Sequence, residues 1–241
     1  MLSSKDQGTR LLTINGSEVK WDMLVDAYRW DTTVNTVRFY NKLNDEHLFP
    51  DNAAKMRNHL AIEVLNKDML GLLHEYKCQV IKDCDYLKGL IELLQQTSKV
   101  ISIFYDHRPI KTANDERLKD LMEFYKFLKA WETNATDNSQ LMSQECRKDW
   151  TSTVLGFCSF VENILSDYPE AEIIPTLMNT DLLENTFGCQ RGLVAGTGTN
   201  PTVMQYCKSI NTITLSTNSI SNKCNASCNS AAVPFNFNGE K

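Results

Sequence analysis

No stretch of this 241-residue sequence is long and apolar enough to cross a bilayer, which takes about 18 or more mostly apolar residues in a row. The first ten residues are polar, and the apolar run Leu11–Ile14 is too short for the core of a secretory signal. We therefore expect a chain that is neither secreted nor inserted into a membrane.

Positive charge is also scarce, because 25 Lys and Arg stand against 30 Asp and Glu, for a formal net charge of -5. A protein that holds DNA by its phosphates normally carries an excess of positive charge. Any DNA contact therefore needs a local patch or another polypeptide segment.

Three further features are missing. The eight cysteines are scattered, and no histidine pair follows their closely spaced members, so neither a disulfide framework nor a zinc site is indicated. No Gly-x-x-x-x-Gly-Lys-Ser/Thr sequence occurs, which excludes a P-loop. The four histidines do not cluster, and we expect surface or core roles for them.

What the sequence does contain is apolar spacing typical of helices. A strand at residues 10–14 is predicted to end in the turn Asn15-Gly16. One amphipathic helix is predicted from Ala53 to about Leu73, and others at about 19–30, 86–103, 115–128, 150–165, 181–190 and from 201 onward. The predicted fold class is mainly α.

The polar segment 132–148 is rich in Asn, Thr, Ser and Gln and is the best domain boundary. It predicts a helical domain over residues 15–135 and a shorter helical unit over 145–212. Residues 213–241 are rich in Ser and Asn with few large apolar side chains, so we expect a disordered tail.

Two regions carry recognisable motifs. The later one reads Asp-Leu-Leu-Glu-Asn-Thr-Phe-Gly-Cys-Gln-Arg over 181–191, followed by Asn-Pro-Thr at 200–202. The earlier one combines Lys-Leu-Asn-Asp-Glu-His at 42–47 with Lys-Met-Arg-Asn-His-Leu-Ala at 55–61. In this order and spacing, the two regions resemble the P-element family of DNA transposases, the THAP-type transposases of animals.

That resemblance implies a helical GTP-binding domain, residues 15–135, inserted before the C-terminal end of an RNase H-like domain, residues 145–212. Lys42, Arg57 and Asn58 would then contact the guanine nucleotide, and His47 would begin a helix. The cofactors implied are GTP, which is bound but not hydrolysed, and Mg²⁺.

Two acids in the later motif would serve the metal ions. By the resemblance, Glu184 is the last catalytic carboxylate and a metal ligand, while Asp181 approaches the nucleotide or its Mg²⁺. They are three residues apart, so both lie on one helix face. Two Mg²⁺ ions that drive an in-line phosphoryl transfer need several carboxylate oxygens.

The other two catalytic acids of the family lie on strands upstream of the insertion, whereas the only acid before Asn15 in this chain is Asp6. The resemblance therefore implies a transposase fragment or remnant that is inactive in DNA cleavage by itself. Its partners would be transposon DNA, in a full-length context, and another copy of the chain. The expected location is the nucleus or the cytoplasm.

Two alternatives remain open. A domesticated helical interaction protein would keep the fold without nucleotide or catalytic role, and an unrelated helical scaffold would share the motifs by chance. In either case Asp181 and Glu184 are solvated acids that complement a helix dipole, and Lys42 and Arg57 are surface cations.

Overall fold

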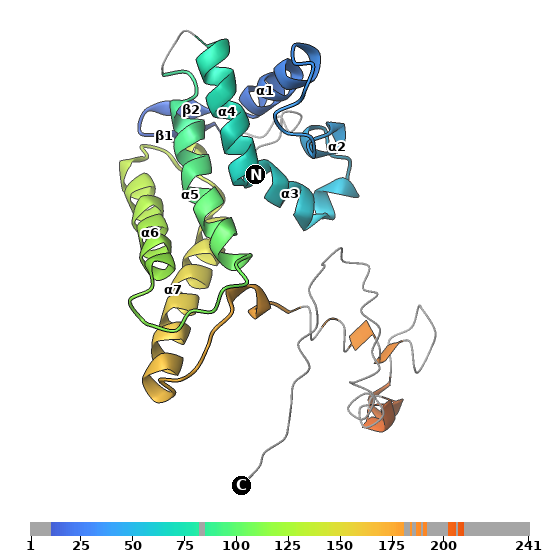
Figure 1. Cartoon of the computed structure of the whole chain (residues 1–241), viewed down its shortest axis with the longest axis vertical. Coiled ribbons are helices and arrows are strands. Elements are labelled where there is room, and N and C mark those ends of the chain that lie inside the picture. Colours follow the sequence, from blue (N-terminus) through green and yellow to red (C-terminus); the bar gives the residue numbers. More distant parts are fainter. Residues whose placement is uncertain are drawn as a thin grey trace. The chain divides into compact units, whose positions relative to one another are not determined.

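The chain is a mainly helical protein, as the periodicity predicts (Figure 1). The computed structural model describes residues 11–81 and 85–180, Glu184, 187–188, 190–191, 202–205 and 207–209. No helix among the described residues is long and apolar enough to cross a membrane. The named elements are β1 Leu12–Ile14, β2 Ser17–Val19, α1 Trp21–Thr33, α2 Asp45–Leu48, η1 Ala54–Met56, α3 Asn58–Leu65, α4 Lys67–Gln79, α5 Lys88–Phe104, α6 Glu116–Asn134, η2 Asn138–Gln140, α7 Gln144–Asp167 and η3 Pro175–Leu177.

Helix α5 lies at the centre of the first compact unit. It packs against α3, α4, α6 and both strands, while α1 packs on α4 and α7 packs on α6 (Figure 1). The apolar side of α5 is fully covered, with Leu90, Leu94 and Val100 at most 1% exposed. Because burying such side chains is the main favourable contribution to folding, α5 organises the core.

The predicted turn joins β1 and β2 into an antiparallel hairpin in which Leu12 pairs with Val19. Both turn residues adopt positive φ, 49° at Asn15 and 80° at Gly16, as a tight two-residue hairpin loop requires. The hairpin lies against α5 so closely that a Cβ on Gly89 would meet the carbonyl oxygen of Ser17 at 2.9 Å.

The single helix expected from Ala53 to Leu73 is wrong, because the segment forms η1, α3 and α4 in succession. Asn66 breaks it by adopting an extended conformation with ψ at 179°, and its side chain accepts hydrogen bonds from the amides of Asp68 and Met69. Its side chain therefore caps a new helix. Apolar spacing continues across the break and hides it.

Helix α7 begins earlier than expected, at Gln144, because the Ser143 side chain accepts a hydrogen bond from the amide of Cys146. The chain divides into two compact units, residues 1–177 and 178–241, so α7 belongs to the first unit together with α6. The family-based domain assignment stays a prediction, and the expected tail, 213–241, lies outside the described residues.

We expect Gly89→Ala to lower the free energy of unfolding by about 1–3 kcal/mol, because the added methyl overpacks the contact between α5 and the hairpin. Urea denaturation measures this change. Gly156→Ala on α7 is the matched control, since its Cβ would meet nothing within 4 Å, and it should stabilise by about 0.5–1 kcal/mol. Equal effects of the two substitutions would contradict the close packing.

Candidate functional site

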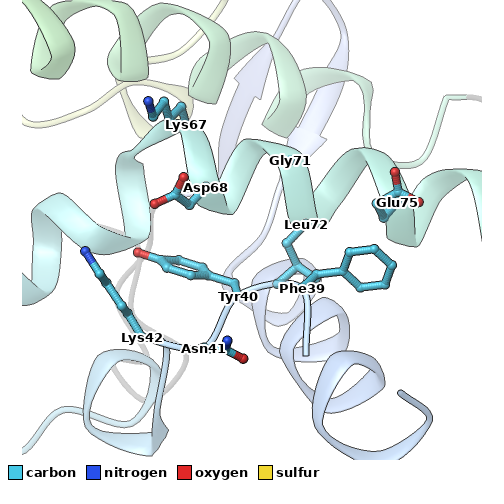
Figure 2. A pocket seen from close by; sticks show the side chains of 9 residues that line it. All are labelled: Phe39, Tyr40, Asn41, Lys42, Lys67, Asp68, Gly71, Leu72 and Glu75. Carbon is cyan, nitrogen blue, oxygen red and sulfur yellow. The ribbon is translucent and has the colours of Figure 1, made fainter. Parts of the chain in front are cut away.

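An open cleft of about 500 Å³ lies between the segment that precedes α2 and the first turns of α4 (Figure 2). Lys42, a predicted nucleotide contact, is part of its wall. The full lining is Phe39, Tyr40, Asn41, Lys42, Lys67, Asp68, Gly71, Leu72 and Glu75.

The wall formed by residues 39–42 has no regular secondary structure, and it is held by the carboxylate of Asp31 at the end of α1. This carboxylate is completely buried. It accepts hydrogen bonds from the amide of Phe39 at 2.7 Å and from the amide of Tyr40 at 3.2 Å. Paired in this way, the buried carboxylate fixes where the wall runs.

Arg38 reinforces the same segment. Its Nε lies 3.7 Å from a carboxylate oxygen of Asp31, and its Nη2 donates to the carbonyl of Leu43 at 2.6 Å. The guanidinium also lies over the Tyr28 ring, 5.4 Å from its centroid. Arg38 therefore connects α1 to the residue that follows Lys42.

The two aromatic side chains of the wall are also constrained. The Tyr40 hydroxyl accepts from the side chain of Asn66 at 2.9 Å and donates to the carbonyl of Glu63 at 3.0 Å. Burial raises the pKa of Tyr40 to about 12, so the phenol is neutral near pH 7. The Phe39 ring stacks on Trp30 with centroids 5.6 Å apart.

Two lysines supply positive charge at one end of the cleft. Lys42 and Lys67 are exposed, and no described residue forms an ion pair with either. Figure 2 shows Asp68 and Lys67 at the N-terminal end of α4 and Lys42 on the facing segment, with the Lys67 side chain extending away from Lys42. The first amides of α4 already donate to the Asn66 side chain, so the positive charge available to an anion such as a phosphate group comes from the lysines.

The other predicted nucleotide contacts lie elsewhere. Arg57 and Asn58 stand at the start of α3, are exposed, and do not line the cleft. Arg57 instead pairs with Glu46 at 2.7 Å. The structure therefore brings Lys42 together with Lys67, a residue that the sequence did not single out. Asn66 was the sequence signal that could have indicated Lys67, because a capping asparagine marks the next residue as the first of a helix.

His47 lies at the start of a helix, as predicted. It is the third residue of α2 and shares a capping box with Asn44. It is 5% exposed, and its Nε2 lies 2.5 Å from the carboxylate of Glu63. The residue serves packing between α2 and α3.

Of the two predicted metal ligands, Asp181 lies outside the described residues. Glu184 is helical and exposed, and it belongs to the second unit. Its carboxylate accepts from the hydroxyl of Thr180 at 3.1 Å. The described residues contain no group of three or more His, Cys, Asp or Glu arranged to hold a metal ion. Glu184 alone is too few ligands for Mg²⁺.

A second cleft, of about 330 Å³, also includes Lys67 and lies beside α5 and α6. Its arginines are already paired. Arg117 donates to Asp115 and Asp106 and to two backbone carbonyls, and Arg108 donates to Asp106. Hydrogen bonds from Arg108, together with the charges of Arg108 and Arg117, lower the pKa of Asp106 to about 2. These contacts therefore hold the loop that connects α5 to α6 in place.

No protein-family model matches this sequence, and no curated protein matches it either. Among solved structures, a chain of the Drosophila P element transposase strand transfer complex matches with a TM-score of 0.66 and 14% sequence identity. The match covers 87% of this chain and 48% of that chain. The protein therefore has a P-element-like transposase fold and spans about half the length of that chain.

We expect Asp31→Ala to lower the free energy of unfolding by about 3 kcal/mol, because two backbone amides lose their buried acceptor and the Arg38 guanidinium loses its ion-pair partner. Urea denaturation followed by circular dichroism measures the loss. Asp22→Ala is the control on the same helix, and as an exposed substitution it should change stability by no more than about 0.5 kcal/mol. A similarly small loss at Asp31 would mean that its carboxylate does not hold the wall.

Low pH should also reveal how much the contacts of Asp106 contribute to the free energy of unfolding. The carboxyl has a pKa of about 2 when folded and an ordinary value of 3.8. Its stabilising contribution is thus complete above pH 3.8 and is lost as the pH falls toward 2. In denaturation curves between pH 4 and 2, Asp106→Asn should lose less stability than the wild type. Asp167→Asn, an exposed control, should follow the wild type. Parallel curves for all three proteins would mean that the Asp106 carboxylate does not stabilise the folded protein.

Proposed function

We propose that this chain is part of a P-element-like transposase and that its first unit binds a guanine nucleotide in the cleft beside Lys42. The fold supports the transposase assignment, and the two motif regions support it independently. One observation carries the nucleotide assignment: Lys42 lies in a cleft with Lys67, and neither has an ion-pair partner among the described residues.

The lysine end of the cleft would bind the phosphates. Ammonium groups pair with phosphate oxygens, and desolvated charge-assisted contacts of this kind are stronger than neutral hydrogen bonds. Asp68 stands at the same end (Figure 2). Phosphate-bound Mg²⁺ usually takes one or two protein carboxylates and keeps several waters, so Asp68 would be its protein ligand.

The second unit would contribute to DNA chemistry through Glu184. The matched structure is described as a strand transfer complex, which supports DNA as the partner of this chain. A single carboxylate does not assemble the two-metal site that cleavage needs. We therefore propose that Glu184 acts only together with further acids, and that this chain alone neither cuts nor joins DNA.

A helical interaction protein is the competing function. It would keep the fold and lose the nucleotide. The two functions differ in one measurable property, because only the first requires the chain to bind GTP.

We expect the purified chain to bind GTP with Mg²⁺, and Lys42→Ala to weaken that affinity about ten-fold or more, because one charge-assisted phosphate contact is lost. Isothermal titration calorimetry measures both values. Lys126→Ala on α6 is the control, since it removes an exposed lysine outside the cleft.

Two results would count against this function in different ways. If Lys42→Ala binds GTP as tightly as the wild type and the control do, the nucleotide does not occupy this cleft. If the wild type binds no guanine nucleotide, the interaction protein is the better assignment.

A further inference from the structure

Helix α4 exposes a histidine and a cysteine that neither the core nor the cleft uses. His74 and Cys78 are both exposed, and neither lines the cleft beside Lys42. Among the described residues, no hydrogen bond, ion pair or disulfide involves either side chain. Because α4 packs on α1, α3 and α5 (Figure 1), the two side chains stand on its remaining, open face. They are therefore free to bind a ligand from outside the chain.

The spacing of this pair suits a metal ion. His74 and Cys78 are four residues apart in one helix, so they share a face, with Cβ atoms about 5–6 Å apart. Zinc binds sulfur at about 2.3 Å and imidazole nitrogen at about 2.0–2.1 Å, which places the two ligand atoms about 3.6 Å apart in a tetrahedral site. Side chains on one helix face can converge to that distance, and zinc sites use ligands at i and i+4.

The chemical types of the two ligands select the metal. Thiolate and imidazole favour Zn²⁺, whereas Mg²⁺ and Ca²⁺ prefer oxygen ligands. The thiol of Cys78 releases its proton to solvent on binding, because the thiolate is the ligand. The Mg²⁺ that we expect with the nucleotide would therefore not compete for this pair.

Two ligands make half of a structural zinc site, which normally has four. Within the described part of the chain, no group of three or more His, Cys, Asp or Glu could hold a metal ion, so no third ligand joins the pair there. A second copy related by a two-fold axis brings the same histidine and cysteine to the same point. The two thiolates of the resulting four-ligand site balance the charge of Zn²⁺.

We propose that His74 and Cys78 bind Zn²⁺ together with the same two residues of a second copy, so that zinc joins two chains through α4. The site is separate from the proposed nucleotide function, because neither residue lines the cleft. Cysteine and histidine spacing along the sequence did not indicate it, since each chain carries only half of the ligands. Because α4 is also a wall of the cleft, the zinc bridge brings the clefts of the two copies close together.

Sedimentation velocity of the full chain tests this bridge, in a buffer whose phosphine reductant keeps the thiols reduced. We expect added Zn²⁺ to convert the chain to a dimer that holds one zinc ion for two chains, and EDTA to reverse the change. Co²⁺ in place of Zn²⁺ should give the visible absorption of a tetrahedral site together with a thiolate-to-metal band, which reports the ligand set directly.

Substitution of either ligand should remove the bridge. Cys78→Ser and His74→Ala should each abolish the zinc-dependent dimer and weaken zinc affinity about 100-fold or more, because each removes two of the four ligands. Both positions are exposed, so the circular dichroism spectrum should stay that of the wild type. Cys207→Ser and His59→Ala are the matched controls, since each removes an exposed side chain of the same type elsewhere, and both should dimerise with zinc.

Three results would overturn the site. Zinc bound at one ion per chain without a dimer would make the pair an adventitious chelator only. A zinc-dependent dimer that persists in Cys78→Ser would mean that other residues hold the metal. A wild type that neither binds zinc nor associates would leave the pair without a metal.

One further variant separates this site from the nucleotide function. Lys42→Ala should still dimerise with zinc as the wild type does, whatever happens to its GTP affinity, because the lysine is not a metal ligand. Loss of the zinc dimer in Lys42→Ala would contradict the separation of the two sites.

Discussion

The carboxylate of Asp31 is buried completely, yet it belongs to the last turns of a helix that ends beside an irregular segment. Backbone amides in such a segment need partners, and Asp31 supplies them at Phe39 and Tyr40. The side chains of Phe39 and Tyr40 add a ring contact and hydrogen bonds of their own. The backbone of this wall, which carries Lys42, is held by the buried carboxylate of Asp31.

The opposite wall depends on a second polar side chain. Asn66 ends α3 and caps α4, and it also donates a hydrogen bond to the Tyr40 hydroxyl. Asn66 therefore begins the α4 wall of the cleft and also contacts Tyr40 in the opposite wall. Lys67 follows it directly, so the helix break decides both where α4 begins and where its first positive charge lies.

Resemblance and structure agree on the fold and differ in how much they say about the site. The P-element-like fold expected from the motifs is confirmed by the structural match over 87% of the chain. Among the nucleotide contacts expected from the motifs, Lys42 lines the cleft, whereas Arg57 pairs with Glu46 outside it. The assignment of Glu184 as a catalytic acid stays a prediction, because the second unit is not placed relative to the first.

By itself the sequence determined the helical class and the turn at Asn15-Gly16, because these follow from apolar spacing and turn chemistry. The motif resemblance singled out Lys42 as a nucleotide contact, which stays a prediction. The break at Asn66 was not predicted, since apolar spacing runs through it and only the capping side chain reveals it. Only the tertiary structure decided that Phe39, Lys67 and Glu75 share a cleft with Lys42. Their meeting requires α1 to pack on α4 and a buried acid to hold the segment between, which are contacts between residues far apart in the chain.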